Sequence, residues 1–332
     1  MKLKVLGSKL FLALLVLLAI TSVLIVGCRG EEAQPTTTKP TYNKLTATLV
    51  PNINLDLYVY IGQDNPTMVP KEIIGSPFDL IAESLSLWGL AIEEGFTLGG
   101  KLTLTNANDA AQILTQIPSQ SKIWASVKDN HIYFVGGSGV AAEALKTPIT
   151  KNDFKYYDDQ EALAEVMLLP DGGTAKLVAV AVARPSQSLL KVIAKNIAPE
   201  ASNTINTLQR WARLQIITAG LYTPQYLDIT EILQGIEQGT IWESNLGILV
   251  SVKSELPGFL VSPIAGRFLD NAGFPKLNLG ELTIYQGILD IGNGKTVPVL
   301  LRIEGSRIFI SISGQKSYAE ELITSIGKSL PD

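Results

Sequence analysis

The sequence predicts an α+β fold in which antiparallel sheets carry helices packed on one face. Short apolar segments that alternate with polar residues recur along the body, as strands of a half-exposed sheet do. Two segments turn at polar residue pairs, Asp129-Asn130 and Gly305-Ser306, which predicts two hairpins. A helical segment follows each hairpin. The hairpins favour antiparallel sheets, and the helices that follow place the chain in the α+β class.

The first part of the body is expected to have a β-α-β-β-α order. Leu55-Leu57-Val59-Ile61 alternates along the second of two strands, and Ser76-Pro77 provides a cap and a first-turn proline for a helix. The expected strands are 43–50, 55–61, 96–105, 122–128 and 131–135, and the expected helices are 76–88, 108–116 and 138–146.

The rest of the body repeats this pattern. The segment 174–183 is continuously apolar, so we expect a central strand that is covered on both faces. The other expected strands are 214–221, 246–252, 281–291, 297–303 and 307–312. The expected helices are 186–197, 201–212, 257–271 with an interruption near Pro263, and 316–326.

An internal duplication is indicated by two similar hairpin-helix segments. Residues 123–134 resemble residues 299–310, and Ala142-Glu143-Ala144-Leu145 answers Ala319-Glu320-Glu321-Leu322 after a gap of one residue. We therefore expect duplicated β-α-β-β-α units. The organisation predicted is a signal peptide at 1–27, a tether at 28–42, a first α+β domain at 43–158 and a second at 159–332.

The N-terminus has the layout of a secretory signal. Lys2, Lys4 and Lys9 precede an apolar run from Leu10 to Val26 that only Thr21 and Ser22 interrupt. Leu24-Ile25-Val26-Gly27-Cys28 resembles the lipobox of bacterial lipoproteins, and this resemblance covers only the first 28 residues. It implies cleavage between Gly27 and Cys28, with lipid attached to the Cys28 thiol.

An uncleaved membrane anchor is the alternative, because 17 apolar residues are at the short edge of what spans a bilayer. Cys28 is the single cysteine of the chain and stands where a lipobox needs it, which favours the lipoprotein. Residues 29–41 are polar and rich in Thr and Pro, as in a flexible tether. The expected location is the cell membrane or outer membrane, facing outside the cytoplasm.

The charge of the body excludes some partners. Without residues 1–27, which hold three lysines and no acidic residue, 24 basic and 31 acidic residues remain, a net charge of about −7. Nucleic acid binding needs clustered Lys and Arg, and so does adhesion of the body to anionic lipid headgroups. We expect neither.

No pattern in the body predicts a cofactor. Gly137-Ser138-Gly139-Val140-Ala141-Ala142 fits G-x-G-x-x-A between a strand and a helix, the setting of a dinucleotide loop. The strand is the second arm of a hairpin, however, and a strand-to-helix turn alone explains glycines with positive φ. A hydrolase elbow at Ser138 would need glycine where Val140 stands.

Catalytic and metal sites are not expected. His131 is the only histidine, and Arg307 replaces it in the second hairpin, so we interpret it as an exposed cross-strand residue. With one histidine and Cys28 used for lipid, a zinc site is close to excluded. Asp158-Asp159 and Asp171 lack calcium-loop spacing and are interpreted as solvated turns. Asp56, Glu143 and Glu320 show no catalytic pattern, although paired carboxylates can come from anywhere in a chain.

One apolar segment, 256–269, contains several large side chains and two prolines. It could line a groove for an apolar ligand or contact a partner, but a core helix kinked at Pro263 is favoured.

Three functions follow in order. The first is a non-catalytic lipoprotein that scaffolds or binds a protein partner at the cell envelope, and the body is similar to exported bacterial proteins of unknown function with repeated hairpin-helix units. The second is a solute- or lipid-binding lipoprotein that serves a transporter, and the third is an envelope hydrolase that uses carboxylates.

Overall fold

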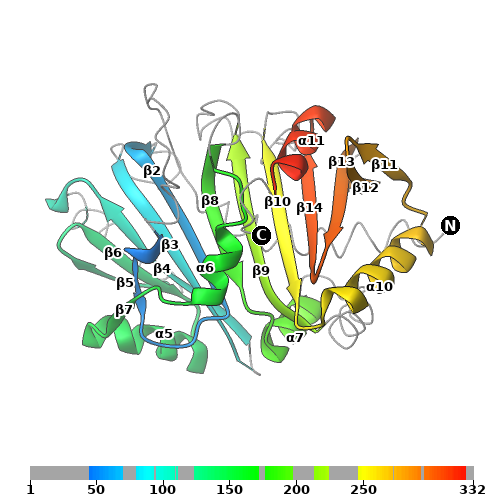
Figure 1. The fold of residues 1–332 in the computed structure, drawn as a ribbon. Coiled ribbons are helices and arrows are strands. Elements are labelled where there is room, and N and C mark those ends of the chain that lie inside the picture. The colour runs from blue at the N-terminus through cyan, green and yellow to red at the C-terminus, as the bar shows by residue number, and fades with distance from the viewer. Residues whose placement is uncertain are drawn as a thin grey trace.

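A computed structural model of the chain describes residues 45–69, 80–92, 95–108, 110, 123–171, 176–196, 213–223, 246–271, 273–292 and 295–326. Its main feature is a single antiparallel sheet of twelve strands in the order β11-β12-β13-β14-β10-β9-β8-β2-β3-β4-β6-β5 (Figure 1). A second, two-stranded sheet pairs β1 with β7. The predicted antiparallel α+β architecture is therefore confirmed, with sheet as the dominant element.

The elements up to the middle of the chain build one side of the large sheet. They are β1 (Leu49–Pro51), β2 (Leu57–Val69), β3 (Leu80–Ile92), β4 (Gly95–Leu104), β5 (Ile123–Lys128), β6 (His131–Gly136), α5 (Val140–Lys151) and β7 (Phe154–Tyr156).

The remaining elements build the other side. They are α6 (Gln160–Val166), β8 (Lys176–Ala183), α7 (Gln187–Asn196), β9 (Leu214–Thr223), β10 (Gly247–Ser254), α10 (Gly258–Asn271), β11 (Lys276–Leu279), β12 (Leu282–Gly292), β13 (Lys295–Glu304), β14 (Arg307–Ser313) and α11 (Lys316–Ser325). The expected boundary after Asp158 falls between β7 and α6. Pairing of β2 with β8 joins the strands on its two sides, and the division into two domains stays a prediction.

The two sides have the same strand order when each is followed outward from the centre. One side runs β2-β3-β4-β6-β5, and the other runs β8-β9-β10-β14-β13 before it continues into β12 and β11. Both hairpins turn in two residues, of which the first has φ 56° in each case, at Asp129 and Gly305. In Figure 1, α5 lies near the lower edge of one side and α11 near the upper edge of the other.

The helices that follow the two hairpins also bury matching positions. Leu145 and Ala142 of α5 are fully buried, and so are Leu322 and Ala319 of α11. These are the pairs that the gapped comparison of the two segments aligns. Both helices contribute to the same hydrophobic cluster, so they cover the same face of the sheet.

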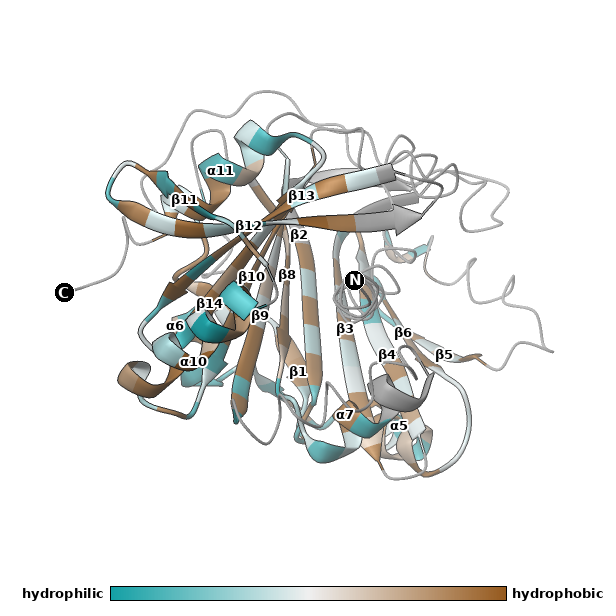
Figure 2. Cartoon of the chain, turned by 90° about the vertical axis from the view of Figure 1, so that its right-hand side faces the viewer, coloured by the Kyte–Doolittle hydropathy of each residue, from teal (hydrophilic) through white to brown (hydrophobic). Residues whose placement is uncertain are grey.

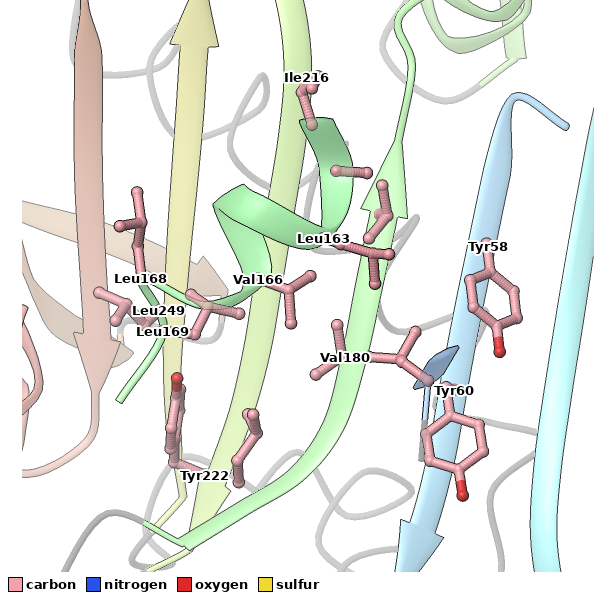
Figure 3. Packing of buried hydrophobic residues seen from close by; sticks show 14 of the residues in the cluster. Tyr58, Tyr60, Leu163, Val166, Leu168, Leu169, Val180, Ile216, Tyr222 and Leu249 are labelled. Atoms are coloured by element: carbon pink, nitrogen blue, oxygen red, sulfur yellow. The ribbon is translucent and has the colours of Figure 1, made fainter. Parts of the chain in front are cut away.

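Alternate residues of each strand face two different hydrophobic clusters. In β8, Val180 and Val182 face the cluster that contains α5, α6 and α11, while Ala181 and Ala183 face the cluster that contains α7. Figure 3 shows the first cluster, where Leu163 and Val166 of α6 lie over β8 and β9. The prediction of a central β8 covered on both faces is confirmed.

Helices occupy both faces, so the expectation of helices on one face is wrong. Leu189 and Leu190 of α7 pack with Leu57 and Leu87 on the face opposite α5. The physical reason is that the inner strands are apolar on both sides, and an uncovered apolar face would stay in contact with water.

The helix expected at 76–88 is also wrong, because β3 covers Leu80–Ile92. Leu85 and Leu87 point to one face while Ser86 and Trp88 point to the other, with all four buried or nearly so. This period of two dominates the Ser76-Pro77 cap signal, which itself lies outside the described residues. The short elements β7, α6 and β11 were not predicted, and the helix expected at 201–212 also lies outside the described residues.

Candidate functional site: the exposed face of helix α10

Helix α10 exposes its largest apolar side chains. The exposed fractions are 75% for Phe259, 41% for Leu260, 45% for Ile264 and 52% for Phe268. Spacings of one, four and nine residues from Phe259 place these side chains on one side of a helix. We call these four residues the α10 stripe. In Figure 2 the helix lies at the periphery of the molecule, with apolar residues along much of its length.

The opposite side of α10 is small and lies close to the sheet. A Cβ atom at Gly258 would come within 2.6 Å of the Gly305 backbone, and one at Gly266 would lie 3.2 Å from the Tyr285 hydroxyl. The Ser262 hydroxyl donates to the Gly305 carbonyl at 3.3 Å, and Val261 is buried. The helix therefore docks through its small residues on the β13–β14 turn and on β12, which leaves the large residues outside.

The predictions of a core helix and of an interruption at Pro263 are therefore wrong. The helix is continuous across Pro263. Proline removes the hydrogen bond to the carbonyl four residues earlier, here that of the exposed Phe259, where water can replace it. The apolar character of the segment was predicted, and its exposure was not.

The surroundings of the α10 stripe carry little net charge. Arg267 is its one basic residue and Asp270 its one acidic residue. The Asp270 carboxylate lies 3.0 Å from the Lys276 ammonium in an exposed ion pair, and such pairs contribute only about 0–1 kcal/mol. The surface is therefore apolar with a neutral rim.

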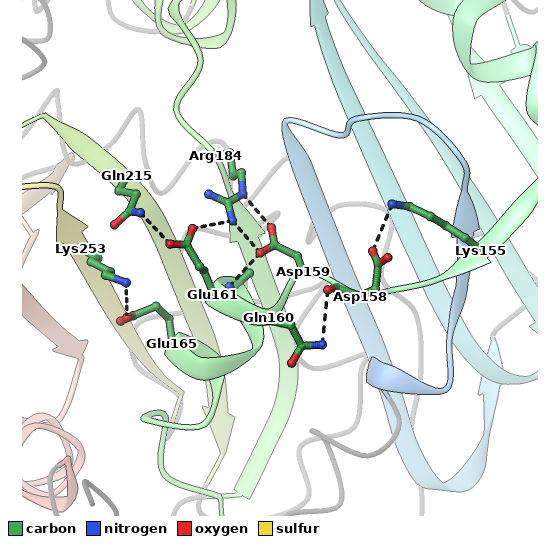
Figure 4. A network of polar contacts seen from close by, with 10 residues as sticks. Lys155, Asp158, Asp159, Gln160, Glu161, Glu165, Arg184, Gln215 and Lys253 are labelled. Atoms are coloured by element: carbon green, nitrogen blue, oxygen red, sulfur yellow. Dashed lines mark hydrogen bonds and ion pairs between the residues drawn. The ribbon is translucent and has the colours of Figure 1, made fainter. Parts of the chain in front are cut away.

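A polar network at the start of α6 has a structural role (Figure 4). Asp159 accepts the Ala162 N–H at 3.1 Å as the cap of this helix, and the Arg184 guanidinium donates to both of its oxygens at 2.6 and 2.7 Å. Burial raises the pKa of Asp159, but these hydrogen bonds and the arginine charge outweigh burial and lower it. Asp159 was expected in a solvated turn and is instead a half-buried anchor.

Glu161 extends the network on the solvent side of α6. Its carboxylate accepts from Arg184 at 3.1 Å and from the Gln215 amide at 3.0 Å. The hydrogen bond to Asp159 is the largest contribution to the raised pKa of Arg184, and Glu161 adds to it. The network ties α6 to β8 and β9, and every carboxylate oxygen that it uses has a structural partner.

Glu165 binds α6 to the far side of the sheet. It is 1% exposed, and its two oxygens accept from Arg307 at 2.8 Å each, while the Lys253 ammonium lies 3.5 Å away. A buried carboxylate is tolerated only when it is paired in this way. No sequence signal pointed to Glu165, because its partners lie about 90 and 140 residues later in the chain.

The residues predicted for lipidation and cleavage, Cys28 and Gly27, lie outside the described residues. The strand-to-helix turn at 137–142 is confirmed, with Gly137 at φ 81° and Gly139 at φ 93°. β6 is antiparallel to both of its neighbours, unlike the first strand of a parallel nucleotide-binding unit.

His131 is a cross-strand residue as expected, paired with Thr103 and Lys128, but it is half-buried and not exposed. Its ring meets that of Tyr133 edge-on at 6.1 Å, and its Nδ1 atom is buried. Burial lowers the pKa of His131, and the charge of Lys101 lowers it further.

The other acidic residues considered have local partners. Asp56 accepts the Ala91 N–H at 2.7 Å, Glu143 pairs with Lys146, and Glu320 lies 3.6 Å from Lys316. Asp158 pairs with Lys155 at 3.1 Å in the solvent. Within the described part of the chain, no three His, Cys, Asp or Glu side chains gather as metal ligands would.

A scan against protein-family models and a search of curated proteins gave no match to the chain. None of the described helices combines the length and the apolar character needed to cross a bilayer. The α10 stripe is therefore the feature on which a function can be argued.

Proposed function

We propose that the protein is a lipoprotein held at the outer face of a membrane by lipid on Cys28. Its non-catalytic body binds a protein partner of the cell envelope through the α10 stripe. The observation that carries this proposal is the exposure of Phe259, Leu260, Ile264 and Phe268 on one side of a helix.

Burial of this stripe would supply a useful part of a binding free energy. Complete burial of a large apolar side chain contributes about 1.5–3 kcal/mol, and these four are roughly half exposed. About 1 kcal/mol from each is therefore available to an interface. Phe259 and Phe268, as aromatic side chains, are of the kind found at interface centres.

A protein partner fits this surface better than a membrane does. Helices that lie in a bilayer surface carry several Lys or Arg residues on their polar side, whereas α10 has only Arg267, balanced by Asp270. The net charge of the cleaved chain, about −7, also disfavours contact with anionic headgroups.

The tether allows the body to meet partners at some distance from the membrane. From Cys28 to Leu45 the chain advances 17 residues, which can span at most about 55–60 Å when fully extended. The α10 stripe can therefore engage an envelope protein without lying against the bilayer.

We also infer that the two sides of the sheet are copies of one ancestral unit. The matching strand orders support this inference, as do the matching hairpin turns and the burial of equivalent residues in α5 and α11. The segment that holds α10, β11 and β12 lies between β10 and β13. In the first copy the strands equivalent to these two, β4 and β5, are separated by fewer residues. The partner-binding helix thus belongs to the more elaborate copy.

Site-specific photocrosslinking in native membranes tests the partner. A photoreactive residue at Phe259 should yield one protein adduct, and one at Tyr156, an aromatic residue 63% exposed on β7, should not. Phe259→Ser combined with Phe268→Ser should abolish the adduct trapped from a third probe at Arg267. Adducts with lipid alone, or equal adducts at both sites, would contradict the proposal.

The anchor has its own test. Inhibition of the lipoprotein signal peptidase should leave the precursor uncleaved, and metabolic labelling with a fatty acid should mark the chain through Cys28. Normal processing of a Cys28→Ser variant would show that the lipobox assignment is wrong.

A further inference from the structure

A row of polar side chains crosses the first copy on the face that carries α5. Direct cross-strand pairs link Ser86 of β3 to Lys101 of β4, and Lys101 to Tyr133 of β6. In the adjacent row, Thr103 pairs with His131. Directly paired residues project from the same face with Cβ atoms about 4.5–5.5 Å apart. We call these five residues the Lys101 patch.

The patch holds buried polar groups without partners among the described residues. Ser86 is fully buried, and its hydroxyl approaches that of Tyr58 without hydrogen-bond geometry. The Nδ1 atom of His131 is likewise buried and unpaired. Unpaired buried donors cost about 1–3 kcal/mol each, so such groups ordinarily meet a bound molecule.

Lys101 adds a cation that is not neutralised. It is half-buried, and no described carboxylate forms an ion pair with its ammonium group. Burial alone lowers the pKa of Lys101, with no acidic neighbour to oppose that effect. A cation in this setting attracts an anion more strongly than an exposed lysine does.

The second copy shows what occupies the equivalent position there. The pair Thr103–His131 corresponds in register to Lys253–Arg307, and Lys101 corresponds to Ser251. In the second copy the cations are met by the carboxylate of Glu165. A carboxylate is thus docked on this part of the sheet in one copy, and the cation of the first copy has no such partner in the described residues.

We propose that the Lys101 patch binds a carboxylate group supplied from outside the chain, with Lys101 as the counter-charge and the hydroxyls of Ser86, Thr103 and Tyr133 as donors. The carboxylate belongs either to a small organic acid or to an acidic side chain of a bound protein. This inference does not depend on α10 or on the lipid anchor.

His131 supplies a direct measurement, because it is the only histidine in the chain. In the full chain, solubilised in detergent and labelled with ¹³C at histidine ε1, a single imidazole signal reports on the patch. Titration with acetate, succinate, a glutamate-containing peptide and inorganic phosphate should shift this signal saturably with at least one carboxylate.

Variants separate binding from general charge effects. Lys101→Met should weaken the carboxylate affinity about tenfold or more, and Lys101→Arg should preserve most of it. Lys128→Met removes a lysine that is also paired with His131 but is exposed, and it should leave the affinity unchanged. Thermal unfolding of each variant should show that the fold is retained.

Each outcome bears on the proposal. Saturation by acetate or succinate identifies a small acid, and saturation by the peptide alone identifies an acidic side chain of a partner. No saturable shift, a response to phosphate alone, or equal affinities of Lys101→Met and the unsubstituted chain would overturn it. None of these results changes the expected crosslinks at α10.

Discussion

At the scale of single residues, cross-strand register decides which side chains meet. Lys101 and His131 lie in neighbouring rows only because β4 pairs with β6 in one particular alignment. A shift of one residue would move Lys101 to the opposite face of the sheet. This is why the pattern of the sequence identified His131 as a cross-strand residue but did not identify Lys101 at all.

The half-buried imidazole makes stability depend on pH. Burial and Lys101 lower the pKa of His131 in the folded chain, while Asp129 opposes them and Lys128 adds a smaller lowering effect. In the unfolded chain the pKa returns to about 6.5. Below that pH the unfolded state binds more protons than the native state, so we expect the free energy of unfolding to fall as pH drops through about 6.5.

A comparison with His131→Gln isolates this contribution. Urea unfolding followed at several pH values between 5 and 8 should show a steeper loss towards acid for the unsubstituted chain than for the variant. Parallel curves would mean that His131 titrates alike in both states. Carboxylates contribute equally to both proteins and therefore cancel in the difference.

At the scale of elements, the hairpins and most strands were predicted because turn residues and period-two patterns are local signals. β3 was assigned as a helix because Ser76-Pro77 resembles a helix start, while its alternation of Leu85 and Leu87 with Ser86 and Trp88 was overlooked. The short helix α6 has only seven residues, and it depends on Asp159, Arg184 and Glu165 contacts that are distant in sequence.

Helix α10 shows a second limit of local patterns. Its large apolar residues form a stripe that amphipathicity would assign to the core. The structure buries the opposite, small side because Gly258 and Gly266 allow the backbone to approach Gly305 and Tyr285. Which side of such a helix is buried depends on the shape of its neighbours, so the candidate site could be located in the sequence but not oriented.

The equivalence of α5 and α11 predicts equal costs when matching residues are truncated. Leu145 and Leu322 are each fully buried in the same cluster. Leu145→Ala and Leu322→Ala should each lower the free energy of unfolding by about 2–5 kcal/mol, the cost of a core cavity. Val140→Ala, at a side chain 62% exposed, should change it by less than about 0.5 kcal/mol.

These three values are measured by chemical denaturation under one set of conditions. A small cost for one of the two leucines and a large cost for the other would mean that the two helices do not close equivalent cores. It would thereby weaken the inference that the two copies share an origin.

At the scale of the whole molecule, the junction between β2 and β8 joins the two copies into one sheet. Val180 pairs with Tyr60, and Val182 pairs with Tyr58, and all four side chains belong to one buried cluster. That cluster also includes residues of α5, α6 and α11, so each copy contributes to covering the other. Separation of the copies would expose this central surface to water.

We therefore expect the two copies to unfold together. Trp88 is fully buried in the first copy, and its fluorescence reports on that copy in a variant with the other three tryptophans replaced by phenylalanine. A cysteine at exposed Ile288, introduced with Cys28→Ser and labelled with a fluorophore, reports on the second copy. Both probes should give the same urea midpoint, as a two-state transition requires. Val180→Asp, which puts a charge in the shared cluster, should lower both midpoints equally. Separate midpoints would instead support two independently folding domains divided near residue 158.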